Sequence, residues 1–378
     1  MMWEKVKFAD IFDFQKKSKC KAGNGLDDGL YPFFTSSDVQ KKSLNEFHFD
    51  RPSLIFGTGG QASVHFCKSK FAVSTDCFVV HPKAENIVTP DFIYYYLNGN
   101  IHILEKGFKG AGLRHISKEY LANIELPLPP LTTQQHIASI LDHADNLRKL
   151  NKQLLQKYDE LAQSVFIEMF GDPVRNEKGW EKKKIKDIVL KIENGWSPVC
   201  IEEPRKNQAV PAVVKLGAVS YRNFNPNENK TLPQNLPFKE ELEIKQYDLL
   251  FSRKNTYDLV GACVYVFETP GKLMIPDTIF RFIYDKTIIM GPYLWMLFND
   301  SNFRKLIQSL ASGSSGSMPN ISKAKLFDFE IPVPSIDKQV QFEKMIINIE
   351  SQKNTLRNEF VKTENIFQSL MQRTFKEK

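Results

Sequence analysis

Residues 127–170 read PLPPLTTQQHIASILDHADNLRKLNKQLLQKYDELAQSVFIEMF, a proline-rich stop followed by a long segment without proline. A Pro-x-Pro stop ends a strand, and the apolar residues after it recur with helical periodicity, so we expect one helix over residues 134–170. At about 1.5 Å per residue this helix is roughly 55 Å long, whereas helices of globular domains usually have about 11 or 12 residues. Such a length is typical of a spacer between domains.

The same plan occurs twice in the chain. Residues 127–131 match residues 332–336, and the shift 321 − 116 = 205 holds from Ile116 and Ile321 to Gln134 and Gln339. The opening nine residues, 3–11, return as residues 180–188 with a shift of 180 − 3 = 177. The middles of the two copies therefore differ in length while their ends keep register. A repeat of this size predicts a duplicated domain rather than a solenoid.

The predicted fold class is α+β, with two similar α/β domains that are each followed by a long helix. Gly171 directly after the first helix and Pro173 two residues later are typical stop signals, so the linker falls at residues 171–179. We expect domains at residues 1–133 and 180–337, with helices at 134–170 and 338–378. The two helices are expected to pack as an antiparallel coiled coil with pseudo-twofold symmetry, although core helices that each pack on their own domain remain the alternative.

Both helices carry apolar residues at heptad spacing, with Asn151, Lys353 and Thr363 as polar interruptions. A polar residue in such a seam costs stability and fixes register, and a frayed or partner-facing position is the other interpretation. The expected seam of the first helix is Ile137, Ile140, Ala144, Leu147, Asn151, Leu154, Tyr158, Leu161 and Val165, and that of the second is Phe342, Ile346, Ile349, Lys353, Leu356, Phe360, Thr363, Phe367 and Leu370.

Composition narrows the class of protein. With 42% hydrophobic and 12% aromatic residues, the chain can build a core in each of two domains, which excludes disorder. The net charge of +7 favours an anionic partner. The start lacks a basic region followed by an apolar one, and no apolar run of about 18 residues occurs, so we expect a cytoplasmic protein without a membrane partner. Five scattered cysteines without a CxxC pair are expected to be reduced and mostly buried.

The order of these features resembles one known family. Two variable domains open on Trp-Glu, close in Pro-x-Pro and a long helix, and are joined by the Phe-Gly-Asp-Pro linker at residues 170–173. This arrangement resembles the specificity subunit of type I restriction-modification systems over essentially the whole chain. The resemblance implies a non-catalytic subunit of an enzyme complex that restricts DNA and methylates adenine. In it each domain reads one half of a split target in double-stranded DNA. The helices set the spacing and dock two methylation subunits, to which restriction subunits add.

Candidate DNA contacts lie on loops that offer cations for phosphates and polar groups for base edges. Glycines there let the backbone approach a ligand, although a plain tight turn is the alternative for each cluster. In the first half we expect contacts from Thr58, Gly59, Gly60, Gln61, Lys109, Arg114 and His115. In the second half we expect them from Lys215, Arg222, Arg253, Lys254, Asn255, Ser314, Ser315 and Asn320. Contacts with partner subunits are expected at Leu147, Leu154, Leu161, Ile349, Leu356 and Phe360.

Motifs for catalysis are missing from the sequence. A methyltransferase would need a Gly-rich cofactor loop and an Asn/Asp-Pro-Pro-Tyr-like tetrapeptide, and Asn225-Pro226-Asn227 is not that motif. Asp277 has no acidic-x-Lys pair after it, as a nuclease would require. We therefore expect no catalytic residue, no metal and no cofactor. The competing hypothesis is a coiled-coil scaffold with two protein-binding domains, which predicts negligible, salt-insensitive affinity for DNA. A self-contained enzyme is the third possibility.

Overall fold

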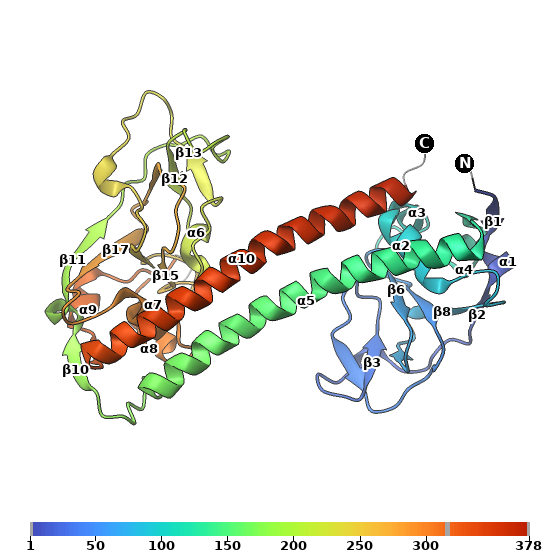
Figure 1. Ribbon diagram of the computed structural model, residues 1–378, viewed down its shortest axis with the longest axis horizontal. Helices are drawn as coiled ribbons and strands as arrows, with labels where there is room; N and C mark the ends of the chain where they lie inside the picture. Colours follow the sequence, from blue (N-terminus) through green and yellow to red (C-terminus); the bar gives the residue numbers. More distant parts are fainter. Residues whose placement is uncertain (1–2, 314–317, 376–378) are drawn as a thin grey trace. The chain divides into compact units, whose positions relative to one another are not determined.

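The computed structural model describes residues 3–313 and 318–375, and it divides into two compact units. Unit 1 comprises residues 1–152 and 358–378, and unit 2 comprises residues 153–357. The two long helices, α5 (Leu131–Phe170) and α10 (Ile336–Phe375), are continuous through this division (Figure 1). Each unit therefore holds one mixed α/β domain and a part of both helices, a sharing that the sequence analysis did not predict.

Unit 1 is built on three small sheets. An antiparallel sheet has the strand order β2-β8-β5-β6, a mixed sheet has the order β4-β3-β7, and β1 pairs with β9. The strands are β1 (Lys5–Lys7), β2 (Phe12–Phe14), β3 (Tyr31–Phe34), β4 (Lys42–Leu44), β5 (Ser53–Gly57), β6 (Val64–Cys67), β7 (Ala72–Val73), β8 (Cys77–Pro82) and β9 (Glu125–Pro127). The short helices are α1 (Phe8–Ile11), α2 (Pro90–Gly99), α3 (His102–Glu105) and α4 (Lys118–Ala122), with a 3₁₀ turn at Ala22–Asn24.

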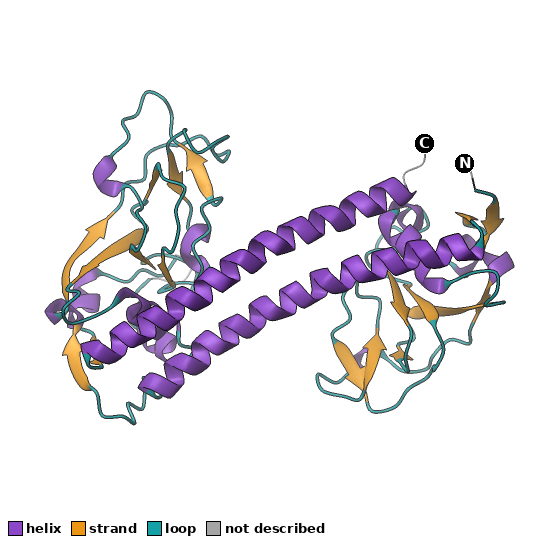
Figure 2. Ribbon diagram, in the orientation of Figure 1, coloured by secondary structure: helices purple, strands orange, loops and turns teal. Residues whose placement is uncertain are grey.

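Unit 2 repeats this topology (Figure 2). Its sheets have the orders β11-β17-β14-β15, β13-β12-β16 and β10-β18. The strands are β10 (Glu181–Lys184), β11 (Val189–Asn194), β12 (Ala212–Val214), β13 (Asn229–Thr231), β14 (Leu249–Ser252), β15 (Cys263–Tyr265), β16 (Leu273–Met274), β17 (Ile279–Tyr284) and β18 (Glu330–Val333). The short helices are α6 (Gly217–Ser220), α7 (Gly291–Asn299), α8 (Phe303–Ser309) and α9 (Lys323–Asp328), with 3₁₀ turns at Ile185–Asp187 and Glu240–Leu242.

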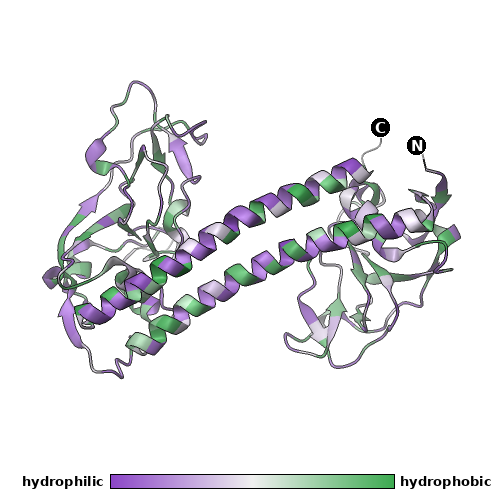
Figure 3. Ribbon diagram, in the orientation of Figure 1, coloured by the Kyte–Doolittle hydropathy of each residue, from purple (hydrophilic) through white to green (hydrophobic). Residues whose placement is uncertain are grey.

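The long helices contribute to the hydrophobic core of both units. In unit 1, Leu141 of α5 and Phe367 of α10 belong to the cluster around Phe8 and Phe92. In unit 2, Phe166 of α5 and Phe342 of α10 belong to the cluster around Tyr293. Each Å² of apolar surface buried stabilises the fold by about 25 cal/mol, so these contacts are the main attachment of each helix to its domain. The alternating hydropathy along both helices reflects these buried faces (Figure 3).

A fully buried glutamine fixes the start of each long helix. Gln134 donates to the carbonyls of Ile87 and Pro129, at 3.0 and 2.8 Å, and accepts from the Thr89 amide at 3.0 Å. Gln339 donates to the carbonyls of Ile288 and Pro334, at 3.1 and 2.8 Å, and accepts from the Met290 amide at 2.8 Å. The two sets are equivalent, and they satisfy backbone groups that would otherwise be buried without partners.

The end of α5 uses the stop chemistry that the sequence predicted. Gly171 adopts a φ of 77°, and its amide donates to the Ile167 carbonyl at 2.8 Å. A left-handed residue after a helix satisfies the last carbonyls, and glycine adopts that conformation without a steric penalty. Trp180 then donates from Nε1 to the Phe170 carbonyl at 2.8 Å, which ties the linker to the helix end.

The buried face of α10 agrees with the predicted heptad seam. On α5, every second residue of the predicted seam is exposed instead of buried. Ile140, Leu147, Leu154 and Leu161, which were expected in the seam, are exposed. The inward face instead carries residues one position later: Leu141, Arg148, Leu155 and Ala162. The prediction was wrong here because α5 is apolar over a wide arc and the charged Arg148 did not look like a seam residue. With the shift of 205, the corrected seam of α5 matches that of α10 position for position.

Two equivalent ion-pair clusters lie where the helices meet. In unit 1, Arg148 pairs with Asp145 at 2.7 Å and with Glu364 of α10 at 3.2 Å. In unit 2, Lys353 pairs with Glu350 and, at 2.6 Å, with Asp159 of α5. The shift of 205 relates all three pairs of positions: 350 − 145, 353 − 148 and 364 − 159.

These clusters set the direction of packing, because early residues of α5 face late residues of α10 and late residues of α5 face early ones. The helices are therefore antiparallel. Two similar α/β domains, each followed by a long helix, with the helices packed against each other, confirm the predicted fold class.

Candidate nucleic-acid interface

Three segments of unit 1 meet at one end of its four-stranded sheet. The loop after β5 lies between the turn before β8 and the loop that precedes α4. The Thr58 amide donates to the Asp76 carbonyl at 2.9 Å, and the Ile116 amide donates to the Thr58 carbonyl at 3.1 Å. Gly59 forms a β-bridge with His115, and His115 forms one with Lys109. We call this meeting of three segments the unit 1 junction.

The equivalent segments of unit 2 meet in the same way. The Arg253 amide donates to the Thr278 carbonyl at 3.1 Å, and the Ile321 amide donates to the Arg253 carbonyl at 2.8 Å. Asn320 forms bridges with Lys254 and Ser312. This unit 2 junction also encloses a pocket of about 380 Å³, lined by Arg253, Lys254, Asp277, Thr278, Ser312, Gly313, Met318 and Asn320.

The predicted residues of unit 1 come together at its junction. Gln61, Lys109, Arg114 and His115 are exposed there. Thr58 is buried, and its hydroxyl donates to the Asp76 carbonyl at 3.0 Å, so this side chain holds the loop in place. Two glycines have separate reasons for their lack of a side chain. Gly60 adopts a φ of 82°, and a Cβ on Gly59 would lie 3.1 Å from the ring of His115.

Unit 2 brings together Arg253, Lys254 and Asn320. Arg253 donates from Nε to Asn320 Oδ1 at 3.0 Å, and Lys254 is exposed. Asn255 is buried, with its amide nitrogen 3.0 Å from Ser220 Oγ and 3.2 Å from Ser252 Oγ, so it supports the loop from inside. Ser314 and Ser315, also predicted here, lie outside the described residues.

Lys215 and Arg222 occupy different places. Lys215 follows β12, and its ammonium donates to the Glu202 carbonyl at 3.3 Å, so its contacts lie beside the three-stranded sheet. Arg222 has a φ of 68°, and its carbonyl accepts from Trp295 Nε1 at 2.9 Å. It lies two residues after Ser220, the partner of Asn255, which connects it to the unit 2 junction.

Cations rest on aromatic rings beside each junction, and of these the sequence analysis predicted Arg253 and missed Lys17, Lys118 and Lys323. In unit 1, Lys118 Nζ lies 5.0 Å from the centre of the Phe14 ring, and Lys17 Nζ lies 5.2 Å from that of Phe78. In unit 2, both Lys323 Nζ and Arg253 Cζ lie over Phe280, at 5.6 and 5.0 Å. The signal was present, since a lysine follows Ile-Ser in both copies at residues 116–118 and 321–323.

Electrostatics distinguishes the cation cluster of unit 2. Burial lowers the pKa of Lys323, and the neighbouring charges of Arg253 and Lys191 lower it further. Glu193 opposes this effect, but it is also paired with Arg281 at 2.6 Å. Lys323 and Arg253 thus carry positive charge without a described carboxylate at ion-pair distance, whereas Lys191 is paired with Glu193.

Side chains that could hold a metal ion are not clustered in the described parts of the chain. Residues 3–313 and 318–375 contain no group of three or more His, Cys, Asp or Glu side chains placed to hold a metal ion. Burial raises the pKa of the Cys77 thiol to about 11, which keeps it protonated and unreactive. Within the same residues, no helix is both long and apolar enough to cross a membrane.

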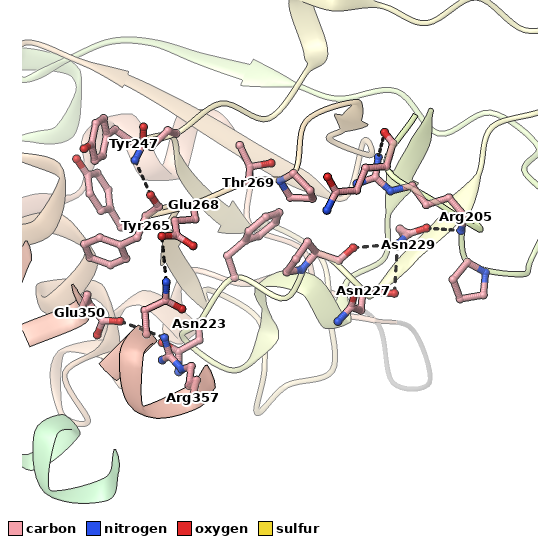
Figure 4. Close-up of a pocket in the computed structure, with 18 of the residues that line it drawn as sticks. Arg205, Asn223, Asn227, Asn229, Tyr247, Tyr265, Glu268, Thr269, Glu350 and Arg357 are labelled. Atoms are coloured by element: carbon pink, nitrogen blue, oxygen red, sulfur yellow. Dashed lines mark hydrogen bonds and ion pairs between the residues drawn. The ribbon is translucent and has the colours of Figure 1, made fainter. Parts of the chain in front are cut away.

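A larger pocket of about 980 Å³ in unit 2 lies apart from the junction (Figure 4). Residues of α10, including Glu350 and Arg357, form one side of it, and the loops around Arg205, Asn229 and Tyr247 form the other. Asn229 is buried, and it accepts from the Arg205 amide at 2.9 Å and donates to the Pro226 carbonyl at 2.8 Å. Asn229 thus holds together the loops on this side of the pocket.

The residues predicted to contact partner subunits divide into two groups. Leu147, Leu154 and Leu161 are exposed on α5, seven residues apart and therefore on one face of the helix. Ile349 and Leu356 are buried within unit 2, and Phe360 of unit 1 is half-buried. The first group is accessible to another chain, Phe360 is accessible in part, and Ile349 and Leu356 are not.

Comparison with known proteins agrees with this architecture. The family model described as the type I restriction modification DNA specificity domain matches residues 2–158 and 177–362. The chain is 33% identical over 172 residues to the EcoEI specificity subunit of Escherichia coli, which covers 46% of this chain and 28% of that protein. It is 23% identical over 381 residues to the MjaVIII specificity subunit of Methanocaldococcus jannaschii, which covers 92% and 86%, respectively.

A solved structure shows the same fold. The type I restriction-modification S subunit from M. genitalium superposes with a TM-score of 0.68 at 14% identity, covering 100% of this chain and 96% of that one. The family model matches both repeats, including the junction segments and most of both long helices. The chain therefore belongs to the family of type I restriction-modification DNA specificity domains.

Proposed function

We propose that this protein is the DNA-reading, non-catalytic subunit of a cytoplasmic type I restriction-modification enzyme. Its reading domains are residues 1–133 and 180–337, and each contacts one half of a bipartite target in duplex DNA. Two methylation subunits, joined by restriction subunits in the full complex, supply the chemistry. The observation that carries this proposal is the junction itself, because the same three segments meet in both units and present exposed cations and polar groups.

The unit 2 junction offers a specific way to read a base. Asn320 holds the guanidinium of Arg253 through Nε, and no described residue accepts from its two terminal nitrogens. A guanidinium fixed in this way can donate both bonds to the O6 and N7 atoms of guanine, the commonest specific contact in the major groove. The pocket beside it, which also contains Lys254, provides the space for a base edge.

The two junctions differ in chemistry, which predicts an asymmetric target. Residues 58–61 of unit 1 are Thr-Gly-Gly-Gln, and the equivalent residues 253–256 of unit 2 are Arg-Lys-Asn-Thr. In unit 1 the cations come instead from Lys109 and Arg114 on the loop before α4. Different donors in equivalent places read different bases, so the two half-sites are expected to have unrelated sequences.

We further propose that a methylation subunit docks on the exposed face of α5. Leu147 in unit 1 and Leu154 and Leu161 in unit 2 are 54%, 42% and 45% exposed, and a row of exposed leucines along one helix is typical of a surface that another chain covers. Their seven-residue spacing favours a partner helix that lies along α5. The buried Ile349 and Leu356 support α10 and stay out of this contact.

Co-expression with a type I methylation subunit, followed by mapping of modified bases in host DNA at single-base resolution, tests the proposal. We expect a split motif with two unrelated halves and a fixed gap. A complex that assembles stably and leaves DNA unmodified would favour the scaffold hypothesis. The matched control is methylation subunit expressed without this chain, which should leave the motif unmodified.

A further inference from the structure

Each unit carries a lysine at the first residue of the short helix that closes its junction. Lys118 begins α4 and Lys323 begins α9, and the two are related by the same shift, 323 − 118 = 205. Each lies three residues after the junction residue that bridges to the hairpin loop, His115 or Asn320. The lysines therefore occupy equivalent places although the loops around them differ in sequence.

Aromatic rings hold these lysines in position. Phe78 and Phe280 occupy equivalent strand positions, because Phe78 of β8 is paired with Phe56 of β5 and Phe280 of β17 is paired with Phe251 of β14. Phe280 lies beneath Lys323, and in unit 1 Phe78 packs edge-on against Phe14, which lies beneath Lys118. A ring face attracts an ammonium within about 6 Å of its centre and does not neutralise it.

A second cation from another segment lies over a ring of the same aromatic group in each unit. In unit 1 it is Lys17, which follows β2, and in unit 2 it is Arg253, which follows β14. No described carboxylate lies within ion-pair distance of these four cations, while nearby Lys191 is paired with Glu193 at 2.8 Å. In unit 2 burial and the neighbouring charge of Arg253 lower the pKa of Lys323, and an anion bound to Lys323 relieves the repulsion between the two charges.

We propose that Lys118 and Lys323, which occupy equivalent places in the repeat, each bind one DNA backbone phosphate. The phosphate contact places each reading domain at a fixed point along its half-site. The divergent loops beside it then meet the base edges. This assignment rests on the proposed DNA-reading function and adds a division of labour, in which the two shared lysines position the protein and the loops specify the sequence.

A DNA phosphate fits these two lysines better than a base edge does. A lysine ammonium presents rotatable donors on a compact charge and carries little geometric information, whereas base reading needs the fixed fork of arginine or an amide. Phosphate contacts account for half or more of the hydrogen bonds in protein–DNA complexes and set register on the duplex. The two repeats keep a lysine at this position while their loops differ in sequence, which fits a lysine that positions the protein and loops that read the bases.

The test compares Lys118→Gln, Lys323→Gln and the double variant with the wild-type chain, each co-purified with its methylation subunits. The measurement is the affinity for two duplexes, the mapped target and a scrambled sequence of equal length, as salt rises from about 50 to about 200 mM. Each lost phosphate contact reduces the slope of log affinity against log salt by about 0.9. Over this fourfold rise in salt, the fold-loss of affinity of a single variant should be about 3.5 times smaller than that of the wild type. For the double variant it should be about 12 times smaller.

Three further variants separate charge from structure. Lys325→Gln removes a cation from the same helix, α9, and the ammonium of Lys325 already donates to the Leu310 carbonyl. Lys83→Gln removes a cation directly after the far end of β8. Both variants should leave the slope unchanged. Lys323→Arg should restore the wild-type slope. We expect Lys118→Gln and Lys323→Gln to weaken binding to both duplexes by the same factor.

Two results would overturn the inference while leaving the proposed function intact. One is a slope that Lys118→Gln and Lys323→Gln leave at the wild-type value, as the Lys325 and Lys83 controls do. The other is a loss confined to the mapped target, which would make these lysines base-reading residues. Binding by the wild-type complex that is absent or insensitive to salt would instead refute the proposed DNA-reading function itself.

Discussion

Replacing Lys353 with methionine tests the ion-pair cluster that joins α5 and α10 in unit 2. The side chain of Lys353 is only 2% exposed, and its ammonium lies between Asp159 and Glu350. Methionine has a similar length and no charge, so the substitution removes the ion pairs without opening a large cavity. The carboxylate of Glu350, which is 6% exposed, then remains buried without its main partner.

The magnitude follows from what each carboxylate can do after the change. Asp159 is 59% exposed and regains water, so it adds little to the penalty. Among the described residues, Glu350 keeps one ion-pair partner, Arg357, at 3.6 Å. Breaking a buried pair by removing one member costs about 3–5 kcal/mol of stability. Because Arg357 remains beside Glu350, we expect a loss of about 3 kcal/mol. Replacing both residues, as Lys353→Met with Glu350→Leu, is expected to return stability to near the wild-type value.

Urea unfolding followed by tryptophan fluorescence measures this effect in the right unit, since Trp180, Trp196 and Trp295, three of the four tryptophans, lie in unit 2. The matched control is Lys362→Met, an exposed lysine on the same helix, which should leave the transition unchanged. The reasoning is refuted if Lys353→Met unfolds at the wild-type urea concentration, or if the double variant is no more stable than the single one.

Three other outcomes are expected. Arg114→Ala should change the methylated motif in one half-site and Arg253→Ala in the other, as read by single-base mapping; an equal change in both halves would contradict modular reading. Gln339→Ala should destabilise unit 2 by about 2–3 kcal/mol in the same urea assay, because it leaves buried backbone groups of Met290 and its neighbours without partners, and a neutral result would show that water replaces the amide. Leu154→Glu should abolish co-purification of a methylation subunit at unchanged stability, and an intact complex would place docking elsewhere.

Much of the fold was predictable because the chain repeats itself. The two Pro-x-Pro stops, the proline-free helices and the Gly171 signal predicted the long helices to within a few residues at their starts. The face of α5 was not predictable from hydrophobicity, since apolar residues occupy both Leu147 and Leu155 and a charge, Arg148, lies in the seam. Aligning α5 with α10 would have shown it, because Lys353 occupies the equivalent position.

The candidate interface was predictable as regions and not as individual side chains. The hairpin loops and the loops before the Ile-Ser pairs do meet, which their matching order in the two copies indicated. The roles of Thr58 and Asn255 were not visible, because a polar loop residue that bonds a neighbouring segment has the same sequence signal as one that faces solvent. The lysines on aromatic rings depend on contacts between strands and a helix far apart in sequence.

The sharing of α10 between the units has a consequence for synthesis of the protein. Phe375 packs against Phe92 and Tyr96 at 5.7 and 5.6 Å between ring centres, so the first domain is covered only after the last turns of α10 exist. At about 5–20 residues per second, the ribosome needs roughly 10–40 s to extend the chain from the end of α5 to that point. Throughout this interval α10 cannot cover the aromatic surface of α2, and exposed surface of this kind makes a partly folded chain prone to aggregation.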